Sequence, residues 1–121
     1  MSMTHIHVPA ADYTITALEA AATPAREYQQ GQPAADAPHR LDKSTGLPIW
    51  EVEAAITHDG ELVHNGRVKI LATAQPQVRA MTAIRAESVR ITPWVDDRAK
   101  RARVQLSWSV VPVPTIQDGG K

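Results

Sequence analysis

Leu47-Pro-Ile-Trp-Glu-Val-Glu-Ala-Ala-Ile-Thr57 carries the clearest secondary-structure signal in this chain. Its even-numbered residues are apolar and its odd-numbered ones include two glutamates: the apolar set is Trp50, Val52, Ala54 and Ile56. A period of two places one set on each face of a strand. Turn-forming residues flank the stretch on both sides, at 42–46 and 58–60. The stretch therefore predicts a half-buried strand and indicates an all-β protein.

A second strand is expected at Gly66-Arg-Val-Lys-Ile-Leu-Ala-Thr73, which alternates in the same way. Folding the chain back about Glu61 predicts an antiparallel hairpin in which Val52 lies near Ile70. The polar faces of the two strands then pair their charges, with Glu51 and Glu53 opposite Arg67 and Lys69. This pairing explains the two glutamates better than a catalytic acid–base pair does.

A second hairpin is predicted from residues 87–95 and 102–110, joined by the polar turn 96–101. Each strand has an apolar face, formed by Val89, Ile91 and Val95 on the first and by Val104, Leu106, Trp108 and Val110 on the second. Pro93 cannot donate a backbone hydrogen bond, so we expect its strand to be at an edge or bulged there.

Residues 13–30 allow two interpretations. The start, Tyr-Thr-Ile-Thr, favours a strand. Thr16-Ala-Leu-Glu19 matches a capping box and Thr23-Pro24 a helix start, although Pro24 would interrupt one continuous helix. We expect a first strand at 13–22 followed by a loop or one helical turn, and a helix within 13–30 stays open.

Length and composition fit one globular domain. The chain has 121 residues, of which 43% are hydrophobic and 21% charged, enough for one core and too few for two. The order of expected elements resembles an OB fold, a five-stranded barrel. We predict a single OB-like domain over 1–121, with its core at about 13–110, little or no helix, and flexible segments at 1–11 and 111–121.

The sequence offers little for catalysis or metal binding. There are no cysteines, and the serines and histidines show no spacing typical of a nucleophile with its base. His5 and His7 share one face of an extended segment, but two ligands do not define a metal site. We expect no enzyme activity, no metal and no cofactor. The absence of a long apolar run predicts no membrane span and a cytoplasmic protein.

Charge is divided unevenly along the chain, although it sums to zero. Residues 1–66 hold three basic and nine acidic residues (3 − 9 = −6), whereas residues 67–103 hold nine basic and three acidic ones (9 − 3 = +6). In the basic part Trp94 lies on the polar face of the second hairpin, where an indole can stack a base while arginines neutralise phosphates. The candidate nucleic-acid-binding residues are Trp94, Arg90, Arg103, Arg101, Lys100 and Arg98.

Three segments carry a resemblance to a known group of proteins: residues 41–53, 86–94 and 101–107. They resemble small accessory proteins of actinobacterial conjugative plasmids and integrated elements, which are similar in turn to OB-type single-stranded DNA-binding proteins of phages and mobile elements. The resemblance implies sequence-tolerant binding of single-stranded DNA during replication or transfer of a mobile element, by a homodimer or homo-oligomer. The alternative is a protein-interaction or assembly module without nucleic-acid binding, in which acidic and basic halves of different subunits meet.

Overall fold

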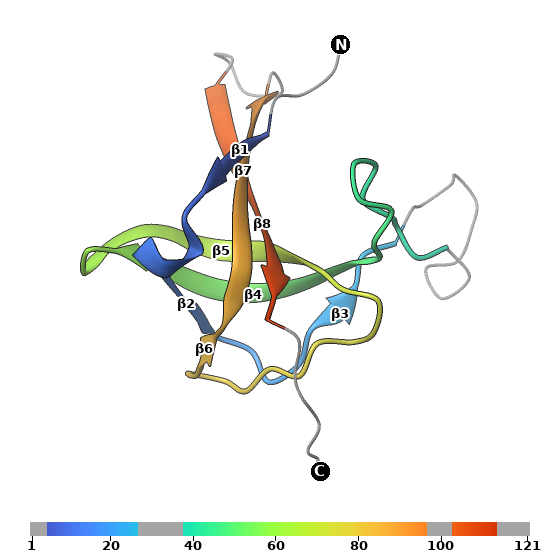
Figure 1. Cartoon of the computed structure of the whole chain (residues 1–121), viewed down its shortest axis with the longest axis horizontal. Coiled ribbons are helices and arrows are strands. Elements are labelled where there is room, and N and C mark those ends of the chain that lie inside the picture. The colour runs from blue at the N-terminus through green and yellow to red at the C-terminus, as the bar shows by residue number, and fades with distance from the viewer. Residues whose placement is uncertain (1–4, 27–37, 97–102, 114–121) are drawn as a thin grey trace.

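The structure is a computed structural model, and it describes residues 5–26, 38–96 and 103–113 (Figure 1). Strands make up most of these residues, and one 3-10 turn, η1 (Ala10–Asp12), is the helical element among them. The prediction of an all-β protein is confirmed. The strands are β1 (Ile6–Val8), β2 (Tyr13–Ala17), β3 (Thr23–Pro24), β4 (Ile49–His58), β5 (Glu61–Leu71), β6 (Ala83–Ile84), β7 (Ala86–Asp96) and β8 (Arg103–Pro112).

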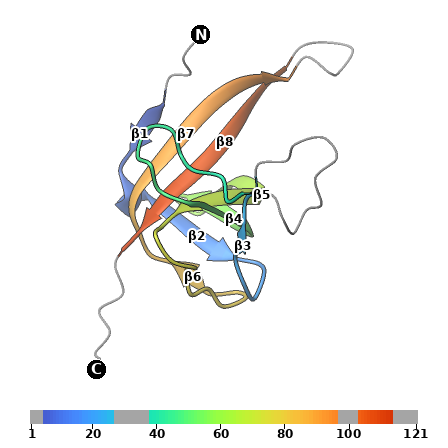
Figure 2. The ribbon, with the colours of Figure 1, turned by 90° about the vertical axis from the view of Figure 1, so that its right-hand side faces the viewer.

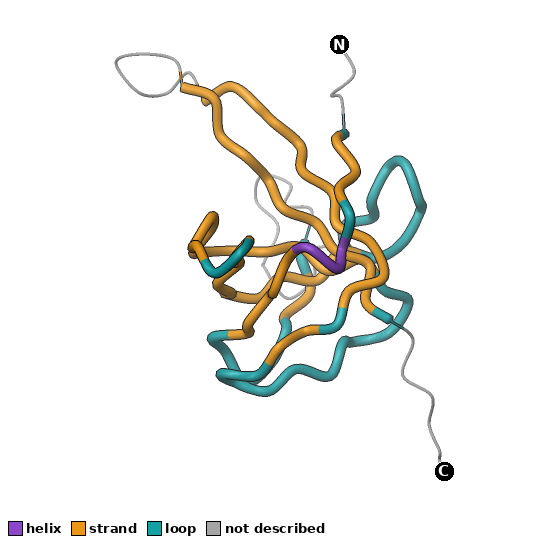
Figure 3. The backbone as a smooth tube through the Cα atoms, turned by 60° about the vertical axis from the view of Figure 1, so that its left-hand side comes forward, coloured by secondary structure: helices purple, strands orange, loops and turns teal. Residues whose placement is uncertain are grey.

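The strands form one sheet that curls into a barrel. Their order is β1-β7-β8-β5-β4-β2-β6, with β3 paired to β4 outside this path. One end of the sheet is formed by β1 and β7 and the other by β2 and β6. The chain connects these ends twice, because β1 leads through η1 into β2 and β6 leads directly into β7 (Figures 1 and 3). The five main strands, β2, β4, β5, β7 and β8, lie in the order expected of an OB-type barrel, in which the third and fifth strands, here β5 and β8, run parallel.

The core fills the inside of this barrel with small aliphatic side chains. Alternate residues of β4, β5, β7 and β8 point inward, as the sequence predicted, and Val52, Ile56 and Ile70 are fully buried. Trp108 is 4% exposed and belongs to the core, as predicted, whereas Trp50 is half-buried against it. Tyr13 and His64 pack on the Trp108 ring at 5.7 and 5.8 Å between centroids, and they cover one end of the barrel.

The first hairpin forms where it was expected, but its register differs from the prediction by two residues. Val52 pairs with Val68 rather than with Ile70, because the chain reverses at Asp59-Gly60 instead of at Glu61. Both turn residues have positive φ, 51° and 81°, as a two-residue hairpin turn that matches the strand twist requires. A bulge between Ile56 and Thr57 then shifts the rest of the ladder by one residue, so Val52 pairs with Val68 and not with Arg67, as the turn alone would give.

Gly60→Ala is expected to lower the free energy of unfolding by about 1 kcal/mol, because a Cβ disfavours φ near +81°. A Cβ there has open space around it, so the cost comes from the backbone alone. Urea unfolding of the variant measures it. Gly60→Asn is the control and should retain most of the stability, since Asn tolerates this conformation; equal losses for Ala and Asn would contradict the explanation.

The second hairpin follows the prediction closely. Val89 pairs with Val110, Ile91 with Trp108 and Val95 with Val104, so the expected apolar faces coincide. β1 pairs with β7 only at 89–91, and β5 pairs with β8 only at 109–110. Residues 92–96 and 103–107 therefore continue as a two-stranded ribbon away from the barrel, which we call the arm (Figures 1 and 3). Pro93 lies in this ribbon at an edge, as predicted.

The N-terminal part of the chain differs from the expectation in two ways. The expected first strand is present as β2 but ends at Ala17 instead of at residue 22, and Thr23–Pro24 is a short strand rather than a helix start; the helical alternative is thereby excluded for these residues. Residues 6–11 were expected to be flexible but belong to β1 and η1, because β1 completes the sheet beside β7. At the other end β8 continues to Pro112, two residues into the second segment expected to be flexible. In the part of the chain that the structure describes, no helix is long and apolar enough to cross a membrane.

Candidate functional site

The outer face of β4, β5, β8 and β7 is the polar side of the barrel. One row of paired residues crosses all these strands and continues onto β1: Glu51, Lys69, Ser109, Arg90 and His7. Since directly paired residues in a sheet lie on the same face, these side chains are neighbours on the outside. In OB-type barrels the outer face of the second and third strands, with the loops beside it, is a common site for oligonucleotides.

Residues 38–48 cover the lower half of this outer face (Figure 2). Apolar contacts hold the segment there, because Leu47 packs against a small second cluster on the outside of the sheet, around Ile49 and Leu71. Backbone hydrogen bonds from Arg40 N–H to Ala25 O (2.8 Å) and from Ile49 N–H to Arg40 O (2.9 Å) fix its course. The segment is thus part of the fold and not an independent loop.

An ion pair joins this segment to β7. The Arg90 guanidinium donates from Nη2 to Asp42 Oδ1 at 2.7 Å and from Nη1 to Asp42 Oδ2 at 3.2 Å. Both side chains are about nine-tenths buried. Arg90 Nη1 also donates to Ser44 Oγ at 2.8 Å, while Arg90 Nε is buried without a partner among the described residues. Two parallel hydrogen bonds make this the geometry in which arginine binds a carboxylate most strongly.

Asp42 also organises the turn that follows it. Its Oδ2 accepts hydrogen bonds from the hydroxyls of Ser44 (2.9 Å) and Thr45 (2.8 Å) and from the Thr45 N–H (3.0 Å). The hydrogen bonds from Arg90 hold the pKa of the Asp42 carboxyl well below its usual range, against the opposing effect of burial. The carboxylate is therefore charged at all ordinary pH values.

This placement corrects the prediction that Arg90 offers a free positive charge to phosphate. The sequence pattern put Arg90 on the outer face, and it is on that face, but Asp42 covers it. A buried guanidinium needs a charge partner, and here the partner comes from 48 residues earlier in the chain. Alternation along a strand carries no information about such a partner.

Lys69 lies beside this pair and retains partial exposure. Burial lowers the pKa of its ammonium group, and the nearby positive charge of Arg40 lowers it further. Arg67, by contrast, is exposed and pairs with Glu51 at 3.7 Å and Glu53 at 4.0 Å. The predicted cross-strand charge pairing is confirmed for Arg67.

The upper half of the outer face belongs to the arm and is not covered by residues 38–48. Trp94 is half-buried there, opposite Gln105 in the ladder. Thr92, which precedes it on this face, is 7% exposed and shares a 2.7 Å hydrogen bond between its Oγ1 and His5 Nδ1. The arm thus offers one partly open indole among uncharged polar side chains.

Of the remaining predicted site residues, the structure describes only the backbone position of Arg103. Arg103 begins β8, opposite Asp96 in the ladder. Arg98, Lys100 and Arg101 fall outside the described residues, so their part in the site stays a prediction. Two exposed cations that the sequence did not single out, Arg40 and Lys43, border the same outer face from the covering segment. Their position depends on the Asp42–Arg90 pair, which links segments far apart in the sequence.

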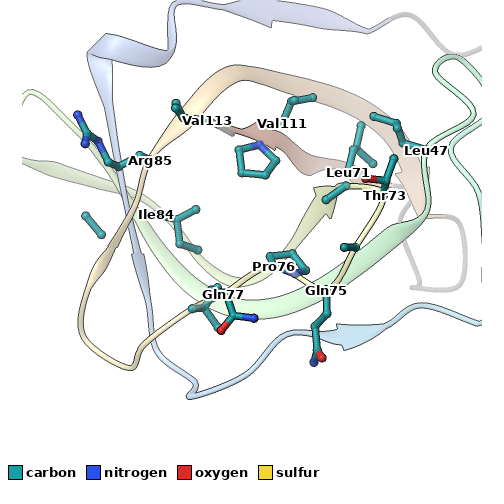
Figure 4. Close-up of a pocket in the computed structure, with 15 residues that line it drawn as sticks. Leu47, Leu71, Thr73, Gln75, Pro76, Gln77, Ile84, Arg85, Val111 and Val113 are labelled. Carbon is teal, nitrogen blue, oxygen red and sulfur yellow. The ribbon is translucent and has the colours of Figure 1, made fainter. Parts of the chain in front are cut away.

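A hollow at the opposite end of the barrel was not anticipated. It has a volume of about 1030 Å³ and lies between the ends of β5 and β8 and residues 72–85 (Figure 4). Its lining is mainly apolar, with Leu71, Pro76 and Val111 among the residues, and Arg85 is the one charged side chain among the described residues that line it. Thr73, Gln75 and Gln77 also line it. The Gln75 amide and the Arg85 guanidinium point away from its interior (Figure 4), so these two do not converge as the few polar groups of a ligand site do. In the described ranges no three His, Asp or Glu side chains lie close enough to hold a metal.

Comparison with known proteins does not indicate which of these surfaces, the outer face or the hollow, carries the function. No protein-family model fits this chain, and neither the curated proteins nor the solved structures contain a significant match to it. The geometry of the outer face is therefore the basis on which a function can be proposed.

Proposed function

We propose that this protein binds single-stranded nucleic acid, with single-stranded DNA as the expected ligand, on the outer face of the arm and beside the segment 38–48, without catalysing a reaction. The observation that carries the proposal is the half-buried Trp94 on the outer side of the hairpin formed by β7 and β8, the fourth and fifth strands of the barrel; in OB-type barrels the connection between these two strands is one of the parts that bind oligonucleotides. An exposed aromatic face suits any base, so it fits binding without sequence preference.

Charge around Trp94 supports the same proposal. Exposed Arg40 and Lys43 border the face on one side, and Arg98, Lys100, Arg101 and Arg103 belong to the sequence that joins and begins the arm strands. Cations beside a stacking surface neutralise the phosphates that follow each base. A role in replication or transfer of a mobile element, in the cytoplasm, remains part of the proposal on the basis of the sequence resemblance.

Titration with a fluorescently labelled single-stranded oligonucleotide at low salt tests this function. We expect Trp94→Ala to weaken binding by about 1–3 kcal/mol per base stacked on it. We expect the double variant Arg40→Glu/Lys43→Glu to weaken binding as well and to make its salt dependence shallower, by about 0.7 in the logarithmic slope for each phosphate that is no longer neutralised. Arg90 is unsuitable for charge reversal, because its loss would disturb the fold.

The matched control is Arg79→Glu/Arg85→Glu, which reverses two exposed arginines on the segment that lines the hollow at the other end of the barrel. It makes the same change in net charge and should leave the slope unchanged. Equal effects of the two double variants would show that only overall charge matters. If the wild-type protein binds no oligonucleotide at low salt, the proposal is wrong.

A further inference from the structure

Lys69 carries a positive charge that has no close partner among the described residues. Its side chain lies on the outer face of β5, where burial lowers the pKa of the ammonium group. Within the described ranges it forms no hydrogen bond and no ion pair. A charged group that loses part of its hydration is stabilised when a partner replaces the lost water. The ammonium group of Lys69 therefore has donors available for an anion from outside the chain.

The two carboxylates that act on Lys69 are already bound to other cations. Asp42 accepts the two parallel hydrogen bonds from Arg90. Glu51, which pairs with Lys69 in the ladder, lies 3.7 Å from the guanidinium of Arg67. Both carboxylates raise the pKa of Lys69, but burial and nearby positive charge outweigh them. The charge of Lys69 is thus not compensated within the described fold.

A second cation is held beside Lys69 by the backbone of the covering segment. The carbonyl oxygen of Arg40 accepts a hydrogen bond from Ile49 N–H at 2.9 Å, and Ile49 pairs with Leu71, two residues beyond Lys69 on β5. Arg40 is exposed, and its guanidinium is close enough to lower the pKa of Lys69. Two like charges held near each other repel, so an anion that contacts both is attracted by both.

We propose that Lys69 and Arg40 together bind one backbone phosphate of the nucleic-acid strand whose base stacks on Trp94. An ammonium and a guanidinium both donate hydrogen bonds to phosphate oxygens, and the guanidinium can donate two in parallel. This site rests on the proposed function, since it uses the same ligand and the same outer face. It extends that function by assigning a phosphate contact to a half-buried lysine of the barrel itself.

The distance between Lys69 and Trp94 suits one strand. Trp94 lies four residues along β7 from Arg90, and Arg90 shares a row with Ser109 and Lys69. Strand geometry therefore places Trp94 and Lys69 roughly 15 Å apart. One OB fold binds about 4–16 nucleotides, and successive phosphates of one strand are about 3.4 Å apart along a duplex axis. The stacked base and the bound phosphate then belong to different nucleotides of the same strand.

Oligonucleotide titrations over a range of salt concentrations test the site. Lys69→Gln should lower the affinity at low salt by about tenfold, and it should make the logarithmic salt slope shallower by about 0.7, the value for one phosphate of a single strand. Lys69→Arg keeps the charge and should keep the slope. Arg79→Gln is the control, because it neutralises one exposed cation in the segment before β6; it should leave the slope unchanged.

The double variant Arg40→Gln/Lys69→Gln tests whether the two cations bind the same phosphate. A shared phosphate predicts that the slope changes by about 0.7 in total, whereas two separate phosphates would change it by about twice as much. The losses of affinity in the two single variants should also add up to more than the loss in the double variant, because the two side chains share one partner. A doubled change in slope with additive losses overturns the shared site.

NMR spectra of lysines labelled by reductive ¹³C-methylation measure the contact directly. A bound phosphate stabilises the charged amine, so the pKa of Lys69 should rise when the oligonucleotide is added. The spectrum of Lys69→Arg identifies the signal. Inorganic phosphate at the same concentration should leave this pKa unchanged; an equal rise would make free phosphate the ligand and overturn the assignment to a strand.

These measurements distinguish failure of the site from failure of the proposed function. An oligonucleotide that binds the wild type and is weakened by Trp94→Ala, but leaves the Lys69 pKa and the slope of Lys69→Gln unchanged, overturns the phosphate site and leaves the proposed function standing. A wild type that binds no oligonucleotide at low salt overturns the proposed function and this site with it.

Discussion

Arg90→Met is expected to lower the free energy of unfolding by about 3–5 kcal/mol, the usual cost of leaving one partner of a buried ion pair behind. The variant removes both hydrogen bonds to Asp42 and the one to Ser44. The carboxylate of Asp42 then stays nine-tenths buried without its countercharge. Urea unfolding followed by circular dichroism measures the loss.

Two controls distinguish the loss of the ion pair from the effect of replacing any arginine by methionine. Arg90→Met/Asp42→Asn removes both charges and should recover much of the lost stability. Arg40→Met changes an exposed arginine of the same segment and should alter stability by no more than about 0.5 kcal/mol. A free energy for Arg90→Met within about 1 kcal/mol of the wild type would contradict a buried ion pair in solution.

The same pair gives a pH dependence with a defined sign. Because the folded protein holds the pKa of Asp42 below that of the unfolded chain, its contribution is complete above the unfolded value of about 4. It is lost progressively as the pH falls below that value towards the depressed pKa. The wild type should therefore lose more stability below pH 4 than Arg90→Met/Asp42→Asn, where this carboxylate is absent.

Trp108→Ala is expected to lower the free energy of unfolding by about 3–5 kcal/mol, because it leaves a large cavity where the arm joins the core. Trp94 provides the matched comparison, since it is the same residue type in the same hairpin on the opposite face. Trp94 is only half-buried, so Trp94→Ala should cost less than about 1.5 kcal/mol. Similar losses for the two variants would mean that Trp94 is structural and not available for stacking.

Much of the fold was predictable because it depends on local alternation. The strands at 49–58 and 86–96 and their apolar faces follow directly from a period of two. The register of the first hairpin was wrong because it depends on which residues make the turn. The Asp59-Gly60 dipeptide was visible as a turn signal, and a strict two-residue turn there predicts the pairs next to the turn, His58 with Glu61 and Thr57 with Leu62. The bulge, which shifts the other pairs by one residue, has no such local signal.

The candidate site was only partly predictable, since contacts between distant parts of the chain determine which of its charged side chains are already paired. Trp94 was placed on the outer face from its spacing alone, and it is there. Nothing local to Arg90 indicates that Asp42 binds it, and nothing local to residues 38–48 indicates that they cover β7 and β8. The exposure of Val95, Val104 and Leu106 on the inner side of the arm was likewise not predictable, because an alternating pattern predicts which side chains face inward but not where the core ends.

The parallel contact between β5 and β8 has a consequence for how the chain folds. Each hairpin closes over a short stretch of chain, whereas Lys69 and Ile70 pair with Ser109 and Val110, 40 residues further along the chain (109 − 69 = 40). Contacts between distant residues form late because closing a long loop costs entropy first. The two hairpins should therefore form early and dock slowly, with closure of the barrel as the rate-limiting step. During synthesis this step must wait until the last strand has left the ribosome, so no N-terminal fragment that ends before β8 should fold stably.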